Sequence, residues 1–169
     1  MVQMERQQRS VDTRGVLLLG FVGTTVLTTI MRASQAFGLT RMDLPLMLGG
    51  MVTSNRDHAK VYGFLIHLLN GWIFAFIYVA FFQYLQRATW WLGAAVGFVH
   101  ACFVLIVGLP AVPGFHPRMA SDAVGPEPTR QLQPPGFMAK NYGHRTAIVT
   151  LLAHLIFGSL LGAFYRLKP

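Results

Sequence analysis

The chain has 169 residues, of which 53% are hydrophobic and only 12% are charged. Soluble domains carry about 25% charged residues, so this composition excludes an ordinary water-soluble domain and indicates a chain that lies largely in a lipid bilayer. The formal net charge of +8 does not indicate a nucleic-acid partner, because the basic residues lie at the ends of apolar stretches, where they orient the chain and contact lipid headgroups.

Residues 1–14 are polar and mix basic with acidic side chains, which is typical of a frayed cytoplasmic tail. Residues 15–37 form the first predicted span, since they begin with a charge-free apolar run and reach the length of about 20 residues that a bilayer requires. A cleaved signal peptide is the alternative, because a basic start, an apolar run and small residues up to Ala36 fit that pattern. Arg32 argues against cleavage, since it separates the apolar run from the small residues.

The apolar segment around Pro45 is too short to span a bilayer and predicts a short interfacial or re-entrant helix. Pro45 suits the first turn of a helix, and Asp43 just before it is typical of an N-cap. Residues 53–60 are polar and are expected to form an exposed loop that leads to the next span.

Three further spans are predicted, at residues 61–85, 90–109 and 146–165. A tight turn joins the span at 61–85 to the span at 90–109. Proline interrupts helices, so Pro110 is expected to end the latter.

A long loop over residues 115–145 precedes the last span. Loops longer than about 15 residues are usually functional or disordered. The prolines of this loop, Pro126 among them, predict a segment that is draped over the bundle. Its expected apolar anchors are Leu132, Phe137 and Met138.

The second and fourth predicted spans share the pattern H-x3-G-x3-small-x2-Y, which starts at His67 and again at His154. Small residues at every fourth position form a stripe along a helix, and in a membrane such a stripe lets a neighbouring helix approach closely. The repetition predicts two hairpins related by an axis along the membrane normal, and convergent packing of small residues is the alternative. It also predicts that these two spans meet, or line one seam, through Gly71 and Gly158. The residues expected at helix contacts are Gly63, Gly71, Ala75, Gly93, Gly97, Gly158 and Gly162.

Three intramembrane histidines are the main candidates for chemistry. The rise of an α-helix places His67 and His154 at similar depths below one membrane face, and His100 near mid-membrane. Together they are candidates to bind haem b or a metal ion, since imidazole suits both. With Asn70 they are also candidates to bind a small ligand or a proton. In the structural alternative each neutral imidazole bonds a carbonyl or hydroxyl across a helix contact.

True two-fold geometry would place the rings of His67 and His154 within about 10 Å of each other, or facing one cavity. Tyr78 and Tyr165, which close the two patterns, are expected in an aromatic belt at the membrane surface.

A second group of candidates lies on the loop side, at the predicted mouth of the bundle. These residues are Asp43, His58, His116 and His144. Carboxylate and imidazole groups there are candidates for a polar or metal site with His67. None of them shows close ligand spacing, so solvated loop residues are the alternative, and helix capping is the expected role of Asp43.

The charge-free first span, the Met42-Asp43-Leu44 segment and the two His-to-Tyr patterns together resemble small four-helix bacterial membrane proteins that are classed as domains of unknown function. The resemblance covers most of the chain. It implies a four-helix fold and no particular activity.

The predicted fold is therefore all-α: a single polytopic membrane domain over residues 15–169, with four transmembrane helices in two pseudo-repeated hairpins and a short interfacial helix. The predicted spans contain no Asp or Glu, and Cys102 is the only cysteine, so carboxylate pairs within the spans and paired-cysteine redox motifs are excluded. No catalytic residue is indicated.

These observations favour a non-enzymatic accessory or binding subunit whose partners are the lipid bilayer and other membrane proteins. A haem- or metal-binding redox subunit and a small transporter or channel component are the alternatives. The expected location is a bacterial inner membrane. Both termini are expected in the cytoplasm, because the short basic turn at Arg87 and the basic tails share one side.

Overall fold

The computed structural model describes residues 11–121, 125 and 127–167. Residues 1–10 of the predicted tail and Pro126 of the long loop lie outside the described residues. Within the described part, four helices are long and apolar enough to cross a membrane. They are α1 (Thr13–Ala36), α3 (Arg56–Tyr84), the helical run Trp90–Gly114 and α6 (Thr146–Phe164). The described residues form no strand, only one isolated bridge between Met119 and Leu132, so the all-α prediction is confirmed.

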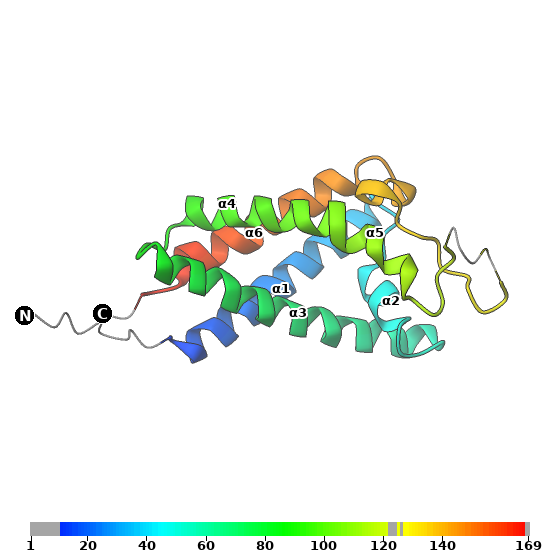
Figure 1. Ribbon diagram of the computed structural model, residues 1–169, viewed down its shortest axis with the longest axis horizontal. Helices are drawn as coiled ribbons and strands as arrows, with labels where there is room; N and C mark the ends of the chain where they lie inside the picture. The colour runs from blue at the N-terminus through cyan, green and yellow to red at the C-terminus, as the bar shows by residue number, and fades with distance from the viewer. Residues whose placement is uncertain (1–10, 122–124, 126, 168–169) are drawn as a thin grey trace, which may run out of the picture.

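The long helices run alternately in opposite directions (Figure 1). One end of the bundle carries the α3–α4 turn together with the start of α1 and the end of α6. The other end carries the short helix α2 (Leu44–Gly49) and the loop of residues 115–145. Asp43 caps α2 as expected, because its Oδ1 accepts a hydrogen bond from the Leu46 N–H at 3.0 Å. The interfacial position of α2 stays a prediction.

Helix α3 begins at Arg56, five residues before the predicted span, so the expected loop at residues 53–60 is partly wrong. The cause is Asn55, whose side-chain oxygen accepts hydrogen bonds from the N–H groups of Asp57 and His58 at 3.0 and 3.1 Å. An N-cap of this kind satisfies the free donors of the first turn, so the helix starts in polar sequence ahead of its apolar part.

The third long helix continues past Pro110, so the prediction that this proline ends it is wrong. It consists of α4 (Trp90–Phe103), the π-helical segment η1 (Val104–Gly108), α5 (Leu109–Ala111) and the 3₁₀ turn η2 (Val112–Gly114). Proline lacks an N–H and its ring crowds the carbonyl one turn earlier. The wider π turn just before Pro110 changes the hydrogen-bond register there and accommodates the ring.

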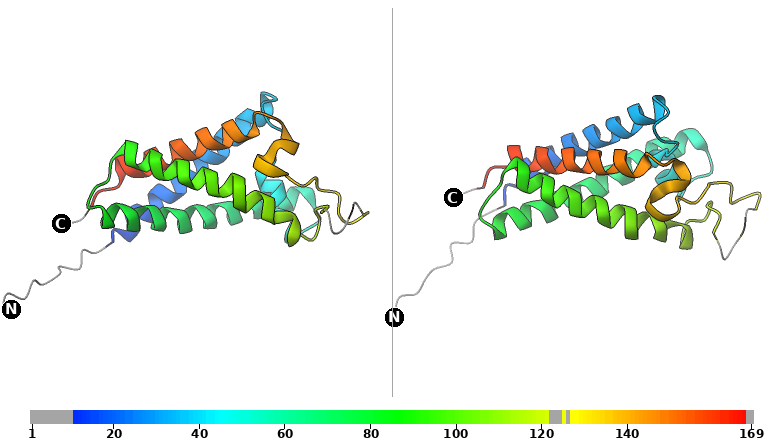
Figure 2. Two further views of the ribbon diagram at one scale, coloured as in Figure 1. Left: turned by 45° about the horizontal axis from the view of Figure 1, so that its top comes forward. Right: turned by 90° about the horizontal axis from the view of Figure 1, so that it is seen from above.

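The four long helices pack as a row of neighbours in which the first and last, α3 and α4, have little contact. Helix α4 packs along α6, α6 along α1, and α1 along α3, while α2 packs on α3. Helices α3 and α4 approach each other closely at few positions, although a short turn joins them, and they diverge toward the end that carries α2 (Figures 1 and 2). The pairs α1–α3 and α4–α6 are those expected as hairpins, but α1 packs as extensively on α6 as on α3, so the two-hairpin repeat stays a prediction.

Glycines occupy the closest helix contacts. A Cβ added at Gly93 would lie 1.9 Å from the carbonyl oxygen of Gly158, and one added at Gly97 would lie 2.4 Å from that of His154. Gly162 lies against Thr89 and Gly93 in the same way. These three glycines therefore bring the backbones of α4 and α6 together.

On α3 the glycines contact other elements. Gly63 lies against the backbone of Pro45 in α2, and Gly71 lies against Thr24 of α1. Ala75 is fully buried. Gly71 and Gly158 thus serve different helix pairs, α1–α3 and α4–α6. Helices α3 and α6 do meet, since a Cβ at Gly158 would also lie 3.0 Å from the Tyr78 ring of α3, but this contact does not run through Gly71.

The long loop packs over the end of the bundle, but not through the expected side chains alone. Leu132 packs against the core, whereas Phe137 is 60% exposed. Among the described residues of the loop, those that are fully buried are His116, Met119, Pro135 and Ala139. Ala139 belongs to the 3₁₀ segment η3 (Phe137–Tyr142), where positive φ angles at Met138 and Ala139 reverse the chain and leave Phe137 outside.

Candidate functional site

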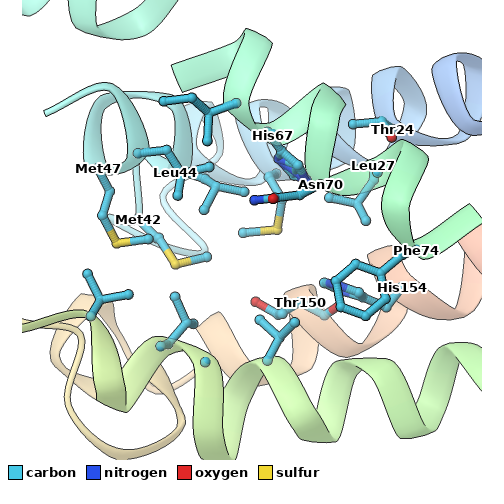
Figure 3. A pocket seen from close by; sticks show the side chains of 18 of the residues that line it. Thr24, Leu27, Met42, Leu44, Met47, His67, Asn70, Phe74, Thr150 and His154 are labelled. Atoms are coloured by element: carbon cyan, nitrogen blue, oxygen red, sulfur yellow. The ribbon is translucent and has the colours of Figure 1, made fainter. Parts of the chain in front are cut away.

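A cavity of about 420 Å³ lies within the bundle, where α3 and α4 diverge. Its walls come from α1, α3, the helical run Trp90–Gly114 and α6, and α2 closes the end that carries the long loop (Figure 3). This volume falls in the range of about 300–1,000 Å³ that is usual for small-molecule sites. No Asp, Glu, Lys or Arg lines the cavity among the described residues.

Methionines form much of the apolar wall. Four of them line the cavity: Met31, Met42, Met47 and Met51. The first three are 2–4% exposed. Methionine is flexible and polarisable, so it adapts to ligands of irregular shape. The sequence analysis missed this wall, although three of the eight methionines of the chain fall within residues 42–51.

Polar side chains lie on two facing walls. His67 and Asn70 belong to α3, and Thr150 and His154 belong to α6. Figure 3 shows the Asn70 amide and the Thr150 hydroxyl extending into the space between these helices. His100 also lines the cavity, from α4. The structure therefore places all four intramembrane candidates, His67, Asn70, His100 and His154, around one cavity.

His154 and His100 are held by hydrogen bonds and ring contacts. The Nδ1–H of His154 donates to the carbonyl oxygen of Thr150 at 2.8 Å, which fixes its tautomer because a carbonyl only accepts. The Nδ1 of His100 lies 3.3 Å from the hydroxyl of Tyr78. Phe74 stacks on the His100 ring with the centroids 3.6 Å apart, and the His154 ring meets it edge-on at 4.6 Å.

Two polar atoms at this site have no hydrogen-bond partner in the protein: His67 Nδ1 and Thr150 Oγ1. Thr150 is only 2% exposed. A buried polar group without a partner costs about 1–3 kcal/mol, so such groups commonly mark a place where a ligand or water completes the bonding. His67 and Thr150 are therefore the residues best suited to meet a bound molecule.

The three histidines do not form the predicted metal site as they are arranged. Among the described residues, no group of three or more His, Cys, Asp or Glu side chains is placed to hold a metal ion. The rings of His100 and His154 touch directly, and Phe74 covers His100, so no plane of haem size fits between these two imidazoles. This contact excludes a haem held between His100 and His154, whereas a haem held by His67 and His154 stays a prediction.

The loop-side candidates have separate surroundings. Asp43 caps α2 and forms a salt bridge with Arg32 at 2.8 Å. His58 is exposed on the first turn of α3, beside Tyr62, and His144 is exposed just before α6. None of these three lines the cavity. The described contacts thus do not gather them with His67 into the site predicted at the mouth.

His116 has a structural position. It is 1% exposed, its Nε2–H donates to the carbonyl oxygen of Met47 at 2.9 Å, and its Nδ1 accepts from the Arg118 N–H at 3.1 Å. Arg118 in turn donates to the carbonyl oxygen of Gly50 at 2.6 Å. Burial lowers the pKa of His116, and Arg118 and Arg130 lower it further, while its backbone hydrogen bonds oppose the shift. The neutral ring therefore ties the long loop to α2.

The aromatic-belt prediction for the two tyrosines is wrong. Tyr78 is 1% exposed and Tyr165 is 4% exposed. Tyr78 packs edge-on against Phe82 and Phe157. The reason is its spacing, because a residue three positions after Ala75 stays on the buried stripe of α3 rather than turning toward lipid.

Comparisons with models of protein families, with curated proteins and with solved structures found no match. The resemblance of the sequence motifs to small four-helix bacterial membrane proteins therefore stays a prediction.

Proposed function

We propose that this protein is a membrane-embedded binding subunit that holds a small, uncharged and largely apolar molecule in the cavity between α3 and α6. The observation that carries the proposal is the pair of unpartnered polar atoms, His67 Nδ1 and Thr150 Oγ1, on residues that line an otherwise mostly apolar cavity. Sites of this composition use a few polar groups to orient a ligand and apolar contacts to bind it.

The absence of charged residues from the described lining supports an uncharged ligand, because a buried charge without a partner is costly.

The test is native mass spectrometry of protein extracted into polymer nanodiscs directly from the source membrane. The wild type is expected to retain a small-molecule adduct that His67→Leu loses. The matched control is His58→Leu, which removes an exposed histidine of the same helix, away from the cavity. A wild type without an adduct, or equal retention by both variants, would contradict the proposal.

The proposed setting is a bacterial inner membrane, with α2 and the long loop on the outer side. Exposed apolar side chains such as Leu18, Leu65 and Val99 fit contact with lipid tails or a partner membrane protein. With Cys102 replaced by alanine, a cysteine at Arg87 is expected to react with a membrane-impermeant maleimide only in permeabilised cells. A cysteine at Gln131, on the exposed loop, is expected to react in intact cells. The reverse result would invert the orientation.

A further inference from the structure

We propose that the cavity takes the ring of an isoprenoid quinone or quinol, which enters sideways from the bilayer between α3 and α4. This inference rests on the proposed binding function and names the ligand class.

The first argument is the route of access. The cavity is only partly enclosed, and Asn70, an exposed residue of α3, extends its amide end into it. Asn70 lies midway along α3, which has 29 residues. A position in the middle of a membrane-length helix lies at the depth of the lipid tails. The opening therefore admits molecules dissolved in the bilayer.

The second argument concerns the side-chain packing beside the opening between α3 and α4. On the side that leads to the α3–α4 turn, Phe74 and Tyr78 of α3 fill the space against His100 of α4. Beyond Phe74 the two helices separate, and small or aliphatic residues of the third helix, such as Val104 and Gly108, face the cavity. The aromatic rings thus fill the space between α3 and α4 on one side of Phe74, and the space between the diverging helices stays open on the other side.

The third argument is the pattern of polar groups. Phosphate headgroups bind most strongly to Lys or Arg, and neither residue lines the cavity among the described residues. The hydrogen-bonding groups lie on facing walls, with His67 and Asn70 on α3 and Thr150 on α6. A neutral ring with oxygen atoms at opposite edges satisfies both walls at once, whereas a lipid with one hydroxyl satisfies only one.

The residues suit both oxidation states of such a ring. A quinone carbonyl accepts hydrogen bonds, which the Asn70 amide and the Thr150 hydroxyl donate. A quinol hydroxyl donates, and a neutral imidazole accepts at the ring nitrogen that carries no proton. Leu27, Met42 and Met47 then contact the ring faces or the first part of the tail.

The experiment titrates decylubiquinone into the protein in quinone-free nanodiscs and measures the Kd by isothermal titration calorimetry. Farnesol, which has an isoprenoid tail and one hydroxyl, is the comparison probe. Thr150→Val is expected to raise the Kd of decylubiquinone about fivefold, the effect of one hydrogen bond. The matched control is Thr28→Val, since Thr28 is equally a buried threonine but bonds only its own helix, at Thr24 O.

A second variant tests the cavity without removing a polar group. Gly108 lines the cavity, and a Cβ there would meet no atom closer than Phe103 O at 3.8 Å, so Gly108→Leu has room to fold. It is expected to raise the Kd at least tenfold by filling the cavity. Its control is Gly114→Leu, where a Cβ has nothing within 4 Å and which lies outside the lining.

Equal binding of farnesol and decylubiquinone would overturn the quinone assignment, and so would quinone binding that Gly108→Leu leaves unchanged. If neither probe binds while the wild type retains another adduct in the mass spectrum, the quinone inference fails and the proposed binding function stands. If no adduct is retained and neither probe binds, both fail.

Discussion

Replacing Gly93 with alanine tests whether the backbone contact between α4 and α6 holds the bundle together. The added Cβ would lie 1.9 Å from the Gly158 carbonyl oxygen, whereas real Cβ contacts essentially never fall below 3.0 Å. The helices must therefore separate by about 1 Å, because the opposing atom is backbone and has no rotamer with which to move away.

The loss in free energy of unfolding depends on the clash between the new Cβ and the backbone of α6. Overpacking typically destabilises a protein by about 1–3 kcal/mol, and a backbone clash belongs at the top of that range. For a chain of this size, each kcal/mol lowers the melting temperature by about 2–4 °C. Gly93→Ala is therefore expected to melt about 6–12 °C below the wild type.

The assay is thermal unfolding in mild detergent, followed by the loss of the monodisperse peak in fluorescence-detected size-exclusion chromatography. Gly114→Ala is the matched control, since a Cβ there has nothing within 4 Å. Melting temperatures that agree within 2 °C for the two variants would refute the view that close glycine packing stabilises the α4–α6 pair.

Three further predictions concern groups outside the cavity. Burial lowers the pKa of His116, so below about pH 6.5 the unfolded chain binds more protons than the folded chain. The free energy of unfolding therefore falls as the pH drops through that value. His116→Gln should weaken this pH dependence in thermal melts at pH 7.5 and 5.5. Burial raises the pKa of Tyr142 to about 12, so the absorbance at 295 nm that Tyr142→Phe removes should not develop until well above pH 10, and a difference that develops near pH 10 would contradict its burial. Asp43→Ala removes the α2 N-cap and should lower the free energy of unfolding by about 1 kcal/mol in denaturant titrations. Arg32→Ala leaves the cap in place and removes the salt bridge, together with a hydrogen bond to Gln35, from a side chain that is 47% exposed; it should cost less, and equal losses would assign the effect to the ion pair.

The sequence predicted the membrane-length helices well because hydropathy over about 20 residues is a strong signal. It placed the start of α3 wrongly because the prediction followed the apolar residues and did not use the cap at Asn55. It ended the third helix at Pro110 because a π turn has no simple sequence signal. A capping side chain and a π turn thus determined two helix ends that a hydropathy profile does not detect.

The candidate site was predicted in part. Depth and stripe arguments selected His67, His100 and His154, and the three line one cavity. The sequence offered no means of finding Thr150 as an unpartnered hydroxyl, because most helical threonines bond the carbonyl four residues earlier, as Thr28 does. The divergence of α3 from α4 depends on how Phe74, Tyr78 and His100 pack, which is a tertiary property that spacing does not encode.

The bonds from His116 and Arg118 to α2 have a thermodynamic consequence. Helix α2 forms a wall of the cavity through Leu44 and Met47, and His116 bonds the carbonyl of that same Met47. Any molecule that is held more tightly when α2 is in place also stabilises the loop, and by reciprocity a partner that fixes the loop increases the affinity of the cavity by the same factor. The long loop and the cavity are therefore coupled energetically through one short helix.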